Sequence, residues 1–157
     1  MKSIYFILIF SFSLVLNCNA QTAIVTSNLE PSSTIALKFI NQYVIFCSQQ
    51  TSPNSKWIKN NKLLTEKFKS TYNILVDSAI KADPEIGLDF DPILDAQDYP
   101  DKGFELVKYD NKTGFVTLKG KDWPDFILVM KIVNQGNKWL VDGSGVINIP
   151  ENNRAKR

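Results

Sequence analysis

The sequence contains no histidine, and this absence excludes more chemistry than any motif present indicates. Without an imidazole, the chain has neither a Ser-His-Asp nor a Cys-His catalytic set. Its two cysteines are too few soft ligands for the common zinc sites. Any catalysis would therefore use carboxylates, tyrosines or lysines. No residue is predicted to be catalytic, and the sequence predicts neither a metal nor a cofactor.

The chain also lacks an excess of charge of either sign. The chain has 18 Lys and Arg against 16 Asp and Glu, a formal net charge of +2. Nucleic-acid affinity depends on clustered basic residues, so we expect no nucleic-acid partner. A long apolar run is also missing, because residues 4–16 fall short of the ~20 residues that a membrane-spanning helix needs. We therefore expect no membrane span.

The short apolar run instead has the features of an export signal. Lys2 precedes it, and residues 18–20 place small side chains where a signal peptidase reads them, which makes Gln21 the new N-terminus. We expect residues 1–20 to be a signal peptide and the protein to be exported, to the periplasm or the extracellular space.

A lipid anchor is the alternative interpretation of the same segment. A bacterial lipoprotein signal would end at Cys18, but it requires a small residue before the cysteine, and Asn17 is a poor fit. An anchor at Cys18 is therefore disfavoured. After cleavage at Ala20, Cys47 is the one remaining cysteine, so core packing without a disulfide must stabilise the fold.

The remaining chain divides into three parts: a flexible N-terminal arm at 21–30, a single α+β domain at 31–150 and a polar tail at 151–157. Apolar residues with helical spacing predict helices over about 31–48 and from about 55 or 61 to 81. Four strands are expected at 104–109, 114–119, 126–133 and about 138–149. The predicted core contains Phe39, Ile40, Tyr43, Phe68, Leu75, Leu128 and Trp139.

This element order predicts N-terminal helices packed on a curved four-stranded antiparallel meander, with the first helix cradled by the sheet. Residues 91–100, Asp-Pro-Ile-Leu-Asp-Ala-Gln-Asp-Tyr-Pro, and 138–143, Lys-Trp-Leu-Val-Asp-Gly, resemble the exported bacterial family known as domain of unknown function 3828. The resemblance covers about residues 31–150. It implies a cystatin-like cone, similar to nuclear transport factor 2, with a pocket at its wide end, and it implies no activity.

The long loop at 83–103, called the acidic loop below, is the first candidate site. Asp89, Asp91, Asp95 and Asp98 place oxygen ligands at short spacing, as a calcium site requires, but they do not match the EF-hand pattern. Asp in such a loop commonly caps turns through its own backbone, and this structural role is favoured over a metal site.

Asp and Tyr together form the second candidate. A carboxylate that moves protons beside a Tyr hydroxyl that stabilises an oxyanion is the chemistry of isomerases and dehydratases. Tyr43, Tyr72 and Tyr99 are candidates for the interior of a pocket, with Asp91 or Asp95 at its rim. The alternative is that these tyrosines are core residues with hydrated hydroxyls.

The third candidate is the pair of aromatic residues Trp57 and Trp123. Trp123 lies in a connection between strands, where a large apolar side chain contacts either a partner or the neighbouring core. The predicted binding residues are Asp91, Asp95, Asp98, Tyr99 and Trp123.

Taken together, these features favour an exported, non-catalytic protein that binds a small ligand or a protein through its pocket or its acidic loop. A small isomerase- or hydratase-like enzyme that uses Asp and Tyr is the first alternative. The second is an immunity-type partner of a secreted toxin, in which the acidic loop meets a basic surface.

Overall fold

The computed structural model describes residues 32–49 and 54–156. Three helices precede a four-stranded antiparallel sheet, so the predicted α+β class is confirmed. The expected signal peptide with Cys18, and the expected arm at 21–30, lie outside the described residues. Among the described residues, none of the helices has the length and apolarity needed to cross a membrane.

Helix α1 (Ser33–Gln49) forms where the sequence predicts a first helix. Its buried apolar side chains recur at helical spacing and include Phe39, Ile40 and Tyr43, none of which is exposed to solvent. The side of α1 outside this stripe is covered only in part. Phe46 is indeed buried, but Ile45 beside it remains 56% exposed.

The second predicted helix is in fact two, α2 (Asn54–Asn60) and α3 (Glu66–Ala82). Between them, the Leu63 carbonyl accepts a hydrogen bond from the amide of Val141, and the Thr65 amide donates one to the Val141 carbonyl. The Thr65 hydroxyl then caps α3 by accepting from the amide of Phe68 at 3.0 Å. This pairing with a distant strand breaks the helix, although the local sequence favours its continuation.

The sheet consists of β1 (Phe104–Asp110), β2 (Phe115–Gly120), β3 (Ile127–Gln135) and β4 (Lys138–Ser144), in that order. Gly136 and Asn137 join β3 to β4 and both have positive φ, as a tight hairpin of this kind requires. The fourth strand ends earlier than predicted, because the chain turns at Gly145, which also has a positive φ. A short 3-10 helix, η1 (Glu151–Asn153), occupies part of the predicted polar tail.

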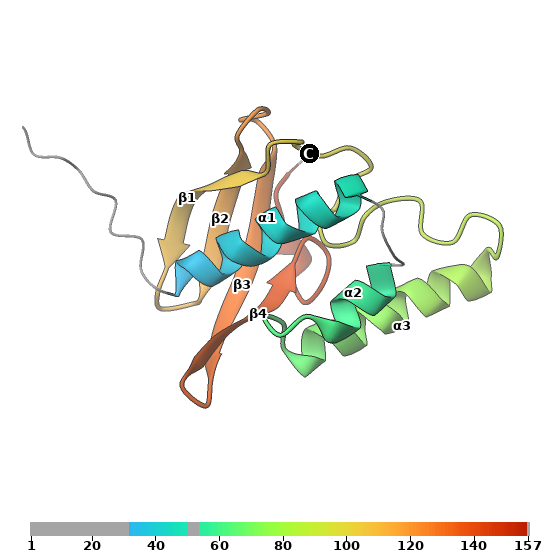
Figure 1. Cartoon of the computed structure of the whole chain (residues 1–157), viewed down its shortest axis with the longest axis horizontal. Coiled ribbons are helices and arrows are strands. Elements are labelled where there is room, and N and C mark those ends of the chain that lie inside the picture. Colours follow the sequence, from blue (N-terminus) through green and yellow to red (C-terminus); the bar gives the residue numbers. More distant parts are fainter. Residues whose placement is uncertain (1–31, 50–53, 157) are drawn as a thin grey trace, which may run out of the picture.

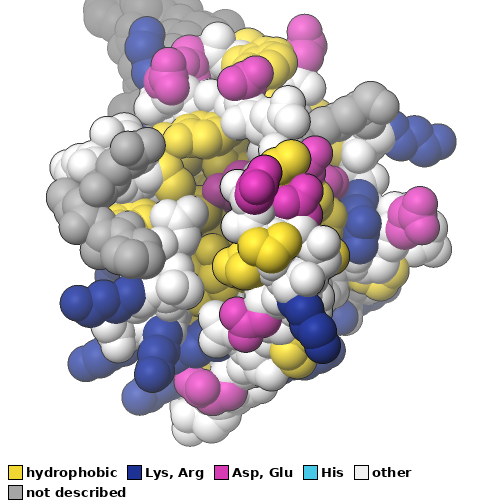
Figure 2. Space-filling view, turned by 90° about the vertical axis from the view of Figure 1, so that its right-hand side faces the viewer, with side chains coloured by type: hydrophobic (Ala, Val, Ile, Leu, Met, Phe, Trp, Pro, Cys, Tyr) yellow, Lys and Arg dark blue, Asp and Glu magenta, His cyan; other side chains and the backbone are white. Residues whose placement is uncertain are grey.

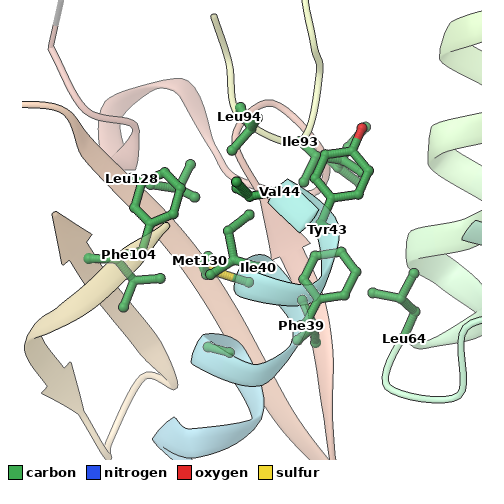
Figure 3. Close-up of a cluster of buried hydrophobic side chains, with 14 of the residues drawn as sticks. Phe39, Ile40, Tyr43, Val44, Leu64, Ile93, Leu94, Phe104, Leu128 and Met130 are labelled. Carbon is green, nitrogen blue, oxygen red and sulfur yellow. The ribbon is translucent and has the colours of Figure 1, made fainter. Parts of the chain in front are cut away.

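Helix α1 lies across one face of the sheet and contacts β1, β3 and β4, whereas α3 lies beside β4 and α2 packs on α3 (Figure 1). Figure 3 shows Ile40 pointing from α1 toward Leu128 and Met130 of the sheet. Of the predicted core residues, Leu75 and Trp139 are only partly buried, while the other five have no more than 3% of their surface exposed.

Candidate functional site

The side chains of Tyr43 and Asp91 meet where the last turns of α1 approach the acidic loop. The Tyr43 hydroxyl donates a hydrogen bond to Oδ2 of Asp91 at 2.7 Å. The side-chain amide of Asn54, at the start of α2, donates to the Tyr43 oxygen at 3.4 Å. In Figure 3, the hydroxyl end of Tyr43 points away from the ring of Phe39, which is stacked beneath it at 6.1 Å. A buried ring thus presents its polar end to the loop.

Asp91 also organises the loop in which it lies. Its Oδ1 accepts hydrogen bonds from the amides of Ile93 and Leu94, at 2.8 and 3.0 Å. The backbone closes the same turn, because the Asp91 carbonyl accepts from the amide of Asp95 and the Asp91 amide donates to Ala96. Asp91 therefore has the turn-capping role that its sequence context favours, in addition to its contact with Tyr43.

Burial raises the pKa of Asp91, Tyr43 and Tyr72. Desolvation is the main cause that raises the pKa of Asp91 above its ordinary 3.8, and the hydrogen bonds from Tyr43 and the loop amides oppose it. Desolvation, with the nearby Asp91 charge, also raises the pKa of Tyr43 well above 10.0 and that of Tyr72 to about 12. Both phenols are therefore neutral hydrogen-bond donors at physiological pH.

Cys47 lies one turn beyond Tyr43 on α1, close to Tyr99 of the acidic loop. Desolvation and then the Asp91 charge raise the pKa of the Cys47 thiol to about 11. A thiol with a raised pKa is mostly protonated and a poor nucleophile at neutral pH, so Cys47 has the character of a small apolar residue rather than of a reactive thiol.

A pocket of about 380 Å³ opens between α3 and the acidic loop, with Asp91 in its lining. We call it the α3 pocket. Asn54, Tyr72 and Asp91 supply polar groups, and the rest of the lining is mostly apolar: Val76, Ile80, Ile86, Gly87, Leu88, Phe90 and Pro92. Figure 2 looks onto this side of the molecule and shows hydrophobic side chains in the floor of a hollow, with Asp and Glu side chains gathered along one edge.

The predicted binding residues do not form one site. Asp98 and Trp123 line a separate hollow of about 310 Å³, where the Trp123 ring packs edge-on against Phe126 at 5.3 Å. Asp95 lies beside neither of these hollows, in a left-handed backbone conformation with φ of +56°. Tyr99 is half-buried beside Cys47. No group of three or more Asp, Glu, Cys or His that could hold a metal ion occurs among the described residues.

Part of the α3 pocket consists of residues outside the predicted site. Asn54 was not singled out, although it reaches the Tyr43 hydroxyl. The acidic loop also supplies an apolar wall that was not predicted, formed by the alternating apolar side chains of Ile86, Leu88 and Phe90. That alternation is the signal from which a pocket wall would have been predicted.

Comparisons of the chain with protein-family models, with curated proteins and with solved structures find no match. Function is therefore inferred from the geometry of the site itself.

Proposed function

We propose that this protein is a non-catalytic binding protein whose α3 pocket holds a small ligand with an apolar body and one hydrogen-bonding head group. The observation that carries the proposal is the division of the pocket lining into apolar walls and a few polar groups, Asn54, Tyr72 and Asp91. Ligand pockets of a few hundred Å³ commonly combine apolar walls with a few well-placed polar groups, which fix the ligand's orientation.

The hydrogen-bonding groups indicate which head group fits. The Asp91 carboxylate is an acceptor that already receives one hydrogen bond on Oδ2 and has lone pairs left for another. A hydroxyl, an amide N–H or an amine would donate to it, whereas a carboxylate or phosphate would be repelled. The neutral hydroxyl of Tyr72 is able to donate to, or accept from, the same head group.

Fluorescence titration with N-phenylnaphthylamine, an apolar dye with one N–H donor, tests this proposal. The dye should brighten on binding the wild-type protein. Val76→Phe fills the pocket from α3 and should abolish the signal. Val107→Phe makes the same change on an exposed position of β1 and should leave it intact. Equal signals from all three proteins would reject the α3 pocket as the binding site.

The head-group role has a test of its own. Tyr72→Phe keeps the ring and removes the hydroxyl, so dye affinity should fall by the ~0.5–1.5 kcal/mol of a typical hydrogen bond. Tyr109→Phe on β1, a half-buried tyrosine away from the pocket lining, is the matched control. An unchanged affinity in Tyr72→Phe would show that the Tyr72 hydroxyl does not contact the ligand.

Proton transfer is the second candidate function, favoured by the Tyr43 hydrogen bond to an Asp91 whose pKa is raised. In this alternative Asp91 would take a proton from a carbon next to a carbonyl, and the Tyr72 hydroxyl would stabilise the resulting oxyanion. Deuterium exchange into small ketones, followed by NMR, is the test. Exchange catalysed by the wild type and lost in Asp91→Asn would favour the enzyme over the binding protein.

Two broader expectations join this proposal. The contacts of α1 with β1, β3 and β4 support a cystatin-like cone around that helix, as the family resemblance implies.

Export to the periplasm or extracellular space is supported by the pattern at residues 1–20. Intact-mass analysis of the secreted protein should give a chain that starts at Gln21, and a mass with lipid on Cys18 would contradict this.

A further inference from the structure

A further hollow on the described part of the molecule is separate from the α3 pocket and shares no lining residue with it. It has a volume of about 680 Å³ and is lined by α1, α2 and the residues that follow α2. We call it the lysine groove, after Lys38, Lys56 and Lys62, which line it together with Ile45, Phe46 and Trp57.

Charge in the lysine groove is of one sign. Its lining includes three lysines and no aspartate or glutamate. The two ion pairs among the described residues join Lys69 to Glu66 and Lys119 to Glu105, so none of the three groove lysines has an acidic partner there. A hollow with this electrostatic character attracts a negatively charged partner.

The apolar surface in the groove provides a place for a side chain to insert. Ile45 is 56% exposed although it lies between the buried residues Val44 and Phe46 near the end of α1. The Trp57 ring is half-buried and stacks on Phe46 at 5.1 Å, which ties it to the buried aromatic rings of the core. Aromatic residues, Trp in particular, are enriched at the centre of protein interfaces.

The remaining lining residues favour a polypeptide as the occupant. Amide side chains, which both donate and accept hydrogen bonds, come from Gln42 and Gln49 of α1, from Asn60 at the end of α2 and from Asn61 just after it. An extended backbone offers the matching alternation of N–H and C=O groups. A hollow between two helices, with lysines and an apolar centre, fits a segment of another protein that carries acids on either side of an apolar residue.

We propose that the lysine groove binds an acidic polypeptide segment, with its apolar side chain against Ile45 and Trp57 and its carboxylates near Lys38, Lys56 and Lys62. This partner is distinct from the ligand of the α3 pocket. Either proposal can therefore fail without the other.

Fluorescence anisotropy with a synthetic peptide tests the assignment. The probe is a short fluorescein-labelled peptide with a central Leu-Phe pair between runs of Glu and Asp, and its counterpart has Lys in place of the acids. The purified protein should bind the acidic probe saturably and more weakly as salt increases, and should not bind the basic counterpart.

Charge reversal locates the site. Lys56→Glu together with Lys62→Glu should weaken binding at least about tenfold. Lys108→Glu together with Lys112→Glu reverses two exposed lysines on β1 and the following turn, and should change binding less than about twofold. All four positions are exposed, so the fold should tolerate both pairs.

A second matched pair tests the apolar centre. Ile45→Ser should also weaken binding, whereas Ile74→Ser, at a 63% exposed position of α3, should not. The proposal is overturned if the acidic probe does not bind, if both lysine pairs have the same effect, or if a sulfated glycan binds the groove and the peptide does not.

Discussion

The Tyr43 hydroxyl and the Asp91 carboxylate, 48 positions apart in the sequence, are joined by a 2.7 Å hydrogen bond. This contact fastens the acidic loop to α1, and the same carboxylate lies in the lining of the α3 pocket. One hydrogen bond therefore links the stability of the loop to the polar part of the proposed binding site.

Removal of the two partners should have unequal effects on stability. Tyr43→Phe leaves a partly buried carboxylate without one of its donors and should cost about 1–3 kcal/mol in urea unfolding. Asp91→Asn should cost less, because its side-chain oxygen still accepts from Ile93 and Leu94 while the charge is removed. A larger loss in Asp91→Asn than in Tyr43→Phe would mean that the negative charge itself stabilises the loop.

The raised pKa of Asp91 predicts a pH dependence of stability. The folded protein holds this proton more tightly than the unfolded chain, so the contribution of Asp91 is most favourable below the ordinary value of 3.8 and falls as pH rises through the folded pKa. Asp110 makes stability depend on pH in the opposite direction. Hydrogen bonds chiefly from Thr113 and Lys112 lower its pKa, so its contribution is lost as pH falls.

Comparison with Asp91→Asn isolates the Asp91 contribution from that of Asp110. We expect the unfolding free energy of the wild type, relative to Asp91→Asn, to increase as pH is lowered from neutral toward 3.8. Urea titrations of both proteins over this range provide the measurement. A difference that stays constant or shrinks on acidification would show that burial does not dominate the pKa of Asp91.

Calcium should not stabilise the protein, because the oxygens of Asp91 already accept hydrogen bonds from the loop and Tyr43. A ligand that binds the folded state alone at a hundredfold excess over its Kd would add about 2.7 kcal/mol. Thermal melts with and without calcium would detect that amount. A calcium-dependent rise in Tm, abolished by Asp91→Asn, would make the acidic loop a metal site.

Phe39 should be among the most sensitive core positions, since its ring is fully buried and contacts Tyr43, Trp57 and Phe68. Phe39→Ala should cost ~3–5 kcal/mol of unfolding free energy. Ile74→Ala removes apolar atoms from an exposed position and should change stability by less than about 0.5 kcal/mol. Similar losses from the two variants would contradict the assigned core.

The sequence was sufficient to predict the α+β class, the first helix and four strands, because each depends on local periodicity and turn residues. It was insufficient for the break between α2 and α3. The residues around Leu63 continue a helical pattern, and only the backbone pairing with Val141 stops it. A contact between segments so far apart in the sequence has no local signal.

In the candidate site, too, local sequence signals were sufficient for some features and contacts between distant segments decided the others. The residue types of Asp91 and Tyr43 make them candidates, but the 2.7 Å hydrogen bond between their side chains depends on how the acidic loop folds back onto α1. Asp91, Asp98 and Trp123 were grouped as binding residues, yet Asp91 lines one hollow and the other two line another. Residue type thus suggested chemistry, while the tertiary fold decided which groups meet.

Amide chemical-shift mapping with N-phenylnaphthylamine tests the proposed binding function most directly. If the dye occupies the α3 pocket, amide signals of Val76, Leu88 and Phe90 should shift progressively during the titration, while those of Val107 and Lys112 on the opposite part of the fold stay fixed. The absence of shifts, or shifts centred on β1 rather than on the pocket lining, would contradict the account.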